Sequence, residues 1–526
     1  QAPSQSIKVN PVDAVQWALF YPPVLTRPDN TPESEFPPTL KDDHDPQLII
    51  YYASQLLAAG RVEEAEKNIE KAISLDQGDS NAIALKSIIA VVKNQKEAAL
   101  QYAQQAVEHN HSAAAHIALS YAHQARFNLQ AALDAAKDAT QVEPENGIAW
   151  ARLAELHLSQ GELQKALDTA NKAAQLDPEL AYSQTILGFA HLTRIKTKNA
   201  KLAFEKAISL NQAAPLPHLG LGLAMIREGD LENGRVEIET ATSLDPRNSL
   251  LRSYVGKAYY EEKRNELAAE QFSIAKQLDP KDPTPWFYDA IRKQTENNPV
   301  EALNNLQESI KLNDNRAVYR SSLLLDSDEA SRNASQARIY TDLGFDFLAL
   351  LEGWKSVNTD PANHSGHRLL ADSYASLPRH EIARVSELLQ SQLLQPLNTT
   401  PIQPQLAETS LGIPEGAGPS DLSNNEFNPL FMRNGTSAQI NAITGSNSTI
   451  GEDFVISNLV GKTAFSVGQF HYETDGFREN NDQTHDIFDI FAQFAITPEF
   501  NIQAEYRTKE SEFGDIVLNF DPNDFS

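Results

Sequence analysis

The sequence "AWARLAELHLSQGELQKALDTANKAAQLDP" occupies residues Ala149–Pro178 and decides the fold. Most of its residues favour helix, and its apolar residues recur with a spacing near 3.6. A polar break at Ser159–Glu162 separates two such segments, and Pro178 follows the second one, where it cannot continue a helix. The stretch therefore predicts two helices joined by a turn and ended by a second turn.

This pattern recurs every 34 residues along the chain. A small residue marks the second helix of six successive units, at Ala132, Ala166, Ala200, Gly234, Ala268 and Ala302. A second small position lies twelve residues earlier in each unit, at Ser120, Ala154, Gly188, Gly222, Gly256 and Ala290. Four of the units end at Pro144, Pro178, Pro246 and Pro280. A fixed period of this length predicts stacked two-helix units.

These three phased series resemble the tetratricopeptide repeat. The aromatic residue typical of that family's first helix is present as Trp150 and Trp286, but Gln184 and His218 replace it in other units. Eight contiguous units fill residues 46–317, and two divergent units follow a spacer around Leu323–Ser331, all within residues 318–392. The resemblance implies a mainly α protein, a right-handed α-solenoid of about ten repeats that needs no single large core.

The resemblance also implies a partner-binding groove, because the first helix of each repeat lines the concave face in this family. The residues that this places on or near the groove are Tyr182, Phe189, Leu219, Leu223, Tyr260 and Phe287. Aromatic and aliphatic side chains on such a face can anchor an extended peptide or a helix. The alternative is that several of them pack between neighbouring repeats.

Two segments of different composition flank the repeats. Residues 1–45 are too short for a domain. They resemble the run that joins periplasmic FecR-like domains to downstream repeats, and the alternative is an apolar cap packed on the first repeat. Residues 393–426 are rich in Pro, Gly, Ser and Asn, which predicts an extended linker.

From about Phe427 to Ser526 the apolar period changes from 3.6 to 2, which predicts an antiparallel β region. In Phe500–Thr508 apolar and polar residues alternate strictly, and Phe488–Ile496 precedes it across a tight turn. Lys462–Phe477 and Ile516–Phe520 predict further strands, and a long polar loop is expected at Arg478–Asp486.

Strands near ten residues with short turns, long polar loops and aromatic ends are typical of a transmembrane β-barrel. A soluble sandwich gives the same alternation. The order of repeats followed by strands resembles outer-membrane export porins, which implies that the lumen is lined by Asp489, Gln493, Gln503, Glu505 and Arg507. Only four to six strands fit, whereas small barrels need about eight. We therefore expect that the natural chain continues past Ser526, that several chains pool strands, or that the strands form a small soluble sheet.

Composition excludes several classes of function. A net charge of −27 argues against a nucleic-acid partner, which requires a basic surface. The chain has no cysteine, so it has no thiolate nucleophile and no disulfide framework. No catalytic motif or metal-ligand spacing is present, and we predict a protein without enzymatic activity, cofactor or metal.

The sequence thus predicts a periplasmic scaffold of the bacterial cell envelope that binds partner proteins or peptides. A C-terminal barrel would tether it to the outer membrane for export or assembly of a surface polymer or protein. The alternative is a soluble or cell-surface scaffold whose β segment mediates docking or self-assembly into homo-oligomers or filaments.

Overall fold

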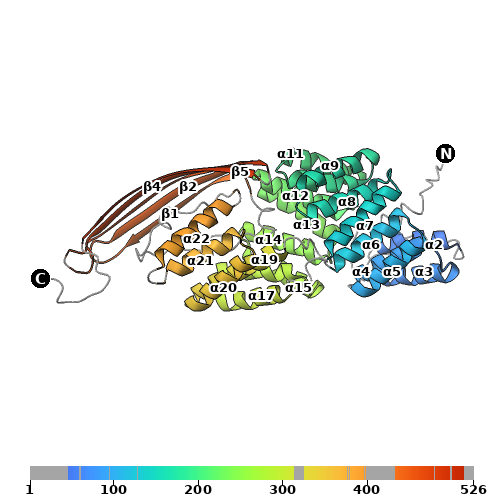
Figure 1. The fold of residues 1–526 in the computed structure, drawn as a ribbon, viewed down its shortest axis with the longest axis horizontal. Helices are drawn as coiled ribbons and strands as arrows, with labels where there is room; N and C mark the ends of the chain where they lie inside the picture. Colours follow the sequence, from blue (N-terminus) through green and yellow to red (C-terminus); the bar gives the residue numbers. More distant parts are fainter. Residues whose placement is uncertain are drawn as a thin grey trace. The chain divides into compact units, whose positions relative to one another are not determined.

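The computed structural model describes residues 45–58, 61–93, 95–126, 128–312, 325–375, 377, 380–395, 397, 433–478, 480–497 and 500–514. This part of the chain is mainly helical, with twenty helices followed by five strands (Figure 1). It divides into two compact units. The first comprises Gln1–Ile226, Asp230–Arg292 and Glu308–Leu325, and the second comprises Arg227–Gly229, Lys293–Gln307 and Asp326–Ser526.

The helices that belong wholly or mainly to the first unit follow one another in pairs, each with a short connection. They are α2 (Pro46–Ala58), α3 (Val62–Leu75), α4 (Ser80–Val92), α5 (Lys96–His109), α6 (Ala113–Ala125), α7 (Leu129–Val142), α8 (Gly147–Ser159), α9 (Leu163–Leu176), α10 (Ala181–Leu192), α11 (Thr197–Leu210), α12 (Pro215–Glu228), α13 (Leu231–Leu244), α14 (Ser249–Glu261), α15 (Asn265–Leu278) and α16 (Pro283–Thr295).

The turns predicted from the 34-residue period have a clear local cause. Asn146 caps α8 by accepting hydrogen bonds from the backbone N–H groups of Ile148 and Ala149, and Asn248 caps α14 in the same way. Such caps satisfy N–H groups that the first turn of a helix leaves without an internal partner. In the repeats that contain the proline, the first helix begins three residues after it, as Gly147 follows Pro144 and Ser249 follows Pro246.

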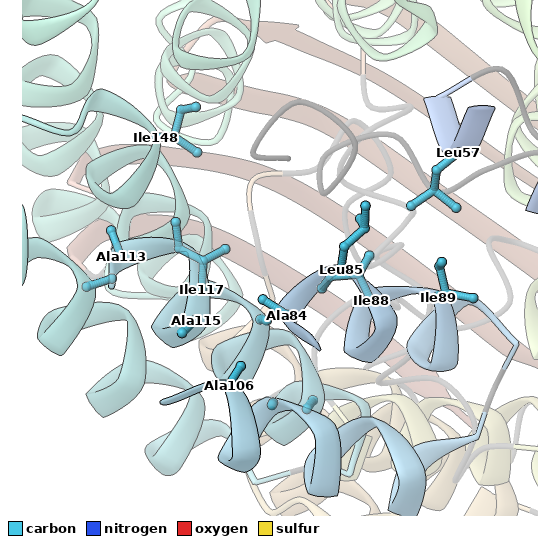
Figure 2. Close-up of a cluster of buried hydrophobic side chains, with 14 of the residues drawn as sticks. Leu57, Ala84, Leu85, Ile88, Ile89, Ala106, Ala113, Ala115, Ile117 and Ile148 are labelled. Atoms are coloured by element: carbon cyan, nitrogen blue, oxygen red, sulfur yellow. The ribbon is translucent and has the colours of Figure 1, made fainter. Parts of the chain in front are cut away.

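The core of the first unit is a continuous band between successive helices rather than one central cluster. It extends from Ile49 to Ala190, and Figure 2 shows part of it, with Leu57, Leu85 and Ile117 among the labelled side chains. The small residues of the second helices, such as Ala132 and Ala166, are completely buried. Their size lets paired helices approach closely, as the repeat pattern predicts.

In the second unit five helices precede the sheet. They are α17 (Pro299–Lys311), α19 (Leu325–Asp342), α20 (Asp346–Thr359), α21 (His364–Ala375) and α22 (Glu381–Leu394). The spacer expected around Leu323–Ser331 is corrected here, because α19 is already helical from Leu325. Among the described helices, none has the length and apolarity needed to cross a bilayer.

The sheet is an antiparallel meander in the order β1-β2-β3-β4-β5. Its strands are β1 (Gly435–Thr444), β2 (Ile450–Val460), β3 (Thr463–Thr474), β4 (Gln483–Thr497) and β5 (Phe500–Phe513). Strands β1 and β5 are its two edges, so the five described strands form an open sheet and not a closed one. The strands are long and bend along their length (Figure 1).

The pairing of the strands tests two details of the predicted β region. The polar loop before β4 is shorter than expected, because Gln483–Asp486 already pair with Thr474–His471 of β3. The tight turn between β4 and β5 is supported by the pairing of Thr497 with Phe500. The strand predicted at Ile516–Phe520, almost all of residues 1–45 and most of the linker lie outside the described residues.

Candidate functional site

The five residues predicted to line a lumen come together on one face of the sheet. Asp489 pairs in register with Arg507, and Gln493 pairs with Gln503. The Arg507 guanidinium donates to the Asp489 carboxylate (Nε to Oδ2, 3.2 Å) and contacts Glu505 (Nη2 to Oε1, 2.8 Å). The period of two along β4 and β5 places these side chains together, as the sequence predicts.

The same polar face continues across the other strands. Asn441 of β1 donates both to Oδ1 (2.8 Å) and to Oδ2 (2.7 Å) of Asp453 on β2, and Ser437 bonds Ser457 (2.7 Å). Asp453, Ser457 and Asp489 are all buried. Buried polar side chains are stable when they hydrogen-bond one another, because these bonds offset the loss of hydrogen bonds to water.

The opposite face of the sheet is apolar and exposed. Its exposed large side chains are Ile440, Phe454, Ile456, Val460, Phe465, Val467, Phe488, Ile490, Phe494, Ile496, Ile502 and Tyr506. Within β4, Ile490 is 42 % exposed while its neighbour Asp489 is only 3 % exposed. The covered face also buries Val455, Leu459, Phe470, Ile487 and Phe491. The sheet therefore covers a face of mixed polarity and exposes a mainly apolar one, whereas a soluble antiparallel sheet usually exposes its polar face.

The end of α22 contacts the polar face. The Gln493 side-chain amide donates to the backbone carbonyl of Gln395 (3.0 Å), and the Gln392 amide donates to Glu505 (2.6 Å). Gln493 is 2 % exposed, so its amide is held between the sheet and the residues that follow α22. These contacts involve two of the five predicted lumen residues.

The six predicted groove residues divide into two groups. Tyr182, Leu219, Leu223 and Phe287 are buried, and Leu223 is only 1 % exposed. Their expected exposure is therefore corrected, because they pack between neighbouring helices, which was the alternative reading of the same positions. Phe189 and Tyr260 remain partly exposed.

The Tyr182 hydroxyl also belongs to a network of hydrogen bonds and an ion pair that joins three successive repeats. Arg152 of α8 is completely buried and contacts the Glu155 carboxylate (Nη1 to Oε2, 2.7 Å). The hydroxyls of Tyr121 on α6 and Tyr182 on α10 both donate to the same Glu155 oxygen (3.2 and 2.9 Å). Burial, reinforced by the Glu155 charge, raises the pKa of both tyrosines, so they remain protonated donors.

Arg152 also joins α8 to the preceding repeat. Its guanidinium donates to Ser120 Oγ (2.9 Å) and Gln124 Oε1 (2.5 Å) and lies 3.5 Å from the centre of the Tyr121 ring. Burial by itself lowers the pKa of Arg152, but the Glu155 charge, the two tyrosines and the hydrogen bond to Glu155 together outweigh it, so the net shift of the pKa is upward. The network links successive first helices, and sequence reasoning missed it because its members lie about 30 residues apart.

A recurring hydrogen bond explains why the aromatic position of the first helix tolerates polar residues. In four repeats this side chain donates to the carbonyl of the residue six positions earlier. The pairs are Trp150 to Pro144 (2.8 Å), Gln184 to Pro178 (3.2 Å), Arg252 to Pro246 (3.0 Å) and His367 to Pro361 (2.9 Å). Gln184, Arg252 and His367 thus each keep an N–H donor for this carbonyl. His218 differs, because its Nδ1 lies 2.8 Å from Glu237 Oε2 instead.

Among the described residues, no group of three or more His, Asp and Glu side chains is arranged to hold a metal ion. Two depressions in the described surface are lined by residues other than those predicted for the groove. One is lined by Glu143, Asn146, Ile148 and Asp177, and the other by Leu351, Trp354 and Lys355. Both are open depressions rather than enclosed cavities.

Comparisons with known proteins agree with the helical pattern. The tetratricopeptide repeat family matches residues 117–181 and 219–283. No curated protein matches the chain. Solved structures that this chain is similar to include the APC/C hetero-tetramer Cut9–Hcn1, at 14% identity and TM-score 0.48, covering 67% of this chain and 74% of that one.

Two further solved structures are bacterial. A tetratricopeptide repeat protein from Parabacteroides merdae is 18% identical with TM-score 0.36, covering 45% of this chain and 93% of that one. PilF of Pseudomonas aeruginosa is 21% identical with TM-score 0.32, covering 41% and 98%. Together with the 34-residue period and the paired helices, the family match shows that this chain carries tetratricopeptide repeats.

Proposed function

We propose that the chain is a non-enzymatic scaffold of the bacterial cell envelope. Its repeats bind protein or peptide partners, and its C-terminal sheet belongs to an outer-membrane β-barrel that serves export or assembly of a surface polymer or protein. The observation that carries this proposal is the exposed apolar face of the sheet, opposite the face that holds Asp453, Asp489 and Gln493. Outer-membrane barrels turn an apolar face to lipid and a polar face to the lumen.

The dimensions of the strands support the same proposal. The five strands contain 10 to 15 residues, and a tilted strand of about 9–11 residues spans the hydrocarbon core. A barrel needs about eight strands, so the open edges β1 and β5 would pair with further strands. Asp489, Gln493, Gln503, Glu505 and Arg507 would face the lumen, and an acidic lumen favours neutral or cationic cargo.

The partner-binding part of the proposal rests on the repeats. Solenoids of this kind present an extended concave surface to partners. Of the predicted groove residues, Phe189 and Tyr260 are the two whose side chains solvent reaches. Replacing both by alanine should abolish partner pull-down and leave helicity unchanged, whereas undiminished pull-down would remove these residues from the binding surface.

A pair of lysine substitutions separates a membrane sheet from a soluble one. Ile490→Lys places a charge in the middle of β4 on the apolar face, where lipid would make it cost about 2–4 kcal/mol. Gln503→Lys is the matched control on the polar face, at a partly exposed position of the neighbouring strand. In a soluble sheet both changes are mild, because Ile490 is already exposed.

The readout is the amount of heat-modifiable protein in carbonate-washed outer membranes of the bacterial host. We expect the Ile490→Lys variant to be lost from this fraction and the Gln503→Lys variant to be retained. Recovery of the wild type and both variants in the soluble fraction would overturn the membrane proposal. In that case the exposed sheet edges would favour the alternative function, a docking or self-assembly module.

A further inference from the structure

The second helices of the last two pairs, α20 and α22, expose far more apolar surface than the corresponding helices earlier in the chain. On α20 the exposed side chains are Phe347, Leu348, Leu351 and Trp354. On α22 they are Ile382, Val385, Leu389 and Leu393. We call these eight residues the apolar patch. By contrast, α11 and α13 each expose only two large apolar side chains.

The residues of each helix form a stripe along one face, because they recur at intervals of three and four. An aromatic bridge joins the two stripes. The Trp354 indole donates to the Tyr374 hydroxyl (2.8 Å), and the Tyr374 ring stacks on His380 with the ring centres 5.4 Å apart. His380 directly precedes α22, so the apolar patch continues from one helix to the other.

The apolar patch has the size of a protein interface. Its side chains are between 44 % and 89 % exposed, which amounts to roughly 800 Å² if a large apolar side chain presents roughly 150–200 Å². The largest patch of a typical monomer is about 300–600 Å². A stable interface buries about 800 Å² on each partner. A shallow depression beside Leu351 and Trp354 could receive a side chain from a partner.

The charges around the apolar patch decide between a lipid surface and a protein. Helices that lie on membranes are rich in Lys and Arg, which attract anionic lipids. Here Lys355 is accompanied by Asp346, Glu352 and Glu387, and the whole chain carries a net charge of −27. These three acidic residues repel an anionic bilayer. Opposite charges lie side by side there, with Lys355 Nζ 3.5 Å from Glu352 Oε2 in the same chain. A two-fold axis through the patch would let the two chains exchange such pairs.

We propose that a second copy of this chain covers the apolar patch in an isologous dimer. This proposal does not depend on whether the sheet enters a membrane. A two-fold contact matches identical surfaces, so a single apolar patch is sufficient for closure. The dimer would present two sets of repeats to partners at once.

The first test measures the mass of the full chain by sedimentation velocity, in detergent if the protein requires it. The variant Leu351→Glu/Leu389→Glu changes two exposed residues of the apolar patch, and Leu202→Glu is the control, because Leu202 is 67 % exposed on α11 outside it. We expect dimers for the wild type and the control and monomers for the double variant, with at least a 100-fold loss of affinity. Circular dichroism should show equal helicity in all three.

A second test uses the absence of cysteine in the chain, which removes any background of cross-linking. Leu389→Cys should form disulfide-linked dimers under mild oxidation, and Leu202→Cys should not. A wild-type protein that stays monomeric at all concentrations, or a double variant that stays dimeric, would overturn the proposal. So would flotation of monomers with phosphatidylcholine vesicles that the double variant abolishes, since that result assigns the patch to lipid.

Discussion

Helices α12 and α13 approach each other closely at a pair of glycines, Gly222 and Gly234, which allows a sharp test of how the small positions work. A Cβ atom on Gly222 of α12 would lie 2.5 Å from the backbone carbonyl oxygen of Gly234 on α13 and 2.7 Å from Ile238 Cγ1. The corresponding positions of most other repeats hold alanine or serine. We predict that Gly222→Ala destabilises the protein, because the nearest obstacle is backbone and cannot rotate away.

Two opposing effects set the magnitude. Alanine is favoured over glycine inside a helix by about 1 kcal/mol. Overpacking of a close contact costs about 1–3 kcal/mol. Because a separation of 2.5 Å from a backbone oxygen forces the helices apart, we expect the upper half of that range and a net loss of about 1–2 kcal/mol in the free energy of unfolding.

The assay is urea unfolding followed by far-ultraviolet circular dichroism. The matched control is Gly353→Ala in the middle of α20, whose Cβ would lie 3.4 Å from Leu370, an ordinary contact. The control should gain stability from helix propensity alone, by up to about 1 kcal/mol. If Gly222→Ala gains stability as the control does, the close approach of α12 and α13 is wrong.

Three further predictions concern the polar contacts of the repeats, and urea unfolding checks each of them. Arg152→Met should cost about 2–4 kcal/mol, because Gln124 and Glu155 lose a buried charged partner, whereas a loss below about 1 kcal/mol would show that water replaces it. Trp150→Phe should lower the free energy of unfolding by about 1 kcal/mol, because it removes the donor to the Pro144 carbonyl. Trp286→Phe is the matched control, because the Trp286 indole nitrogen has no hydrogen-bond partner among the described residues. Equal losses of stability in the two variants would contradict the role of the bond. Burial lowers the pKa of His116, and it lowers the pKa of His157 despite the neighbouring Glu162. As the pH falls, these histidines therefore bind protons in the unfolded state before they do so in the folded state. The free energy of unfolding should therefore fall as the pH drops below about 6.5, and His116→Gln should reduce this slope; a slope unchanged by the substitution would assign the effect to other groups.

Much of the candidate site was predictable from alternation in the sequence. The strict alternation in β4 and β5 placed Asp489, Gln493 and Arg507 on one face, and the register of the sheet agrees. Alternation could not say which face would be covered, since a soluble sandwich and a membrane barrel share the same pattern. Only the exposure of Ile490 beside a buried Asp489 distinguishes the two faces.

The groove prediction shows the opposite case. Counting along the repeat placed Leu219, Leu223 and Phe287 on the expected binding face, but the structure buries all three between helices. One-dimensional spacing cannot separate a residue that faces a groove from one that faces the next repeat, because both kinds of position recur with the same 34-residue period. The buried network around Arg152 could not be predicted for a related reason, because charged residues in a helix usually lie on the protein surface.

The sequence by itself determined the repeating unit, its period of 34 residues, and the change from helices to strands near residue 430. These features are local, because helix propensity, caps and prolines act within a few residues. Only the tertiary structure decided which small residues touch, which groove residues are buried, and which face of the sheet remains uncovered. Those outcomes depend on contacts between residues distant in the chain, and such contacts are fixed by packing after the local elements have formed.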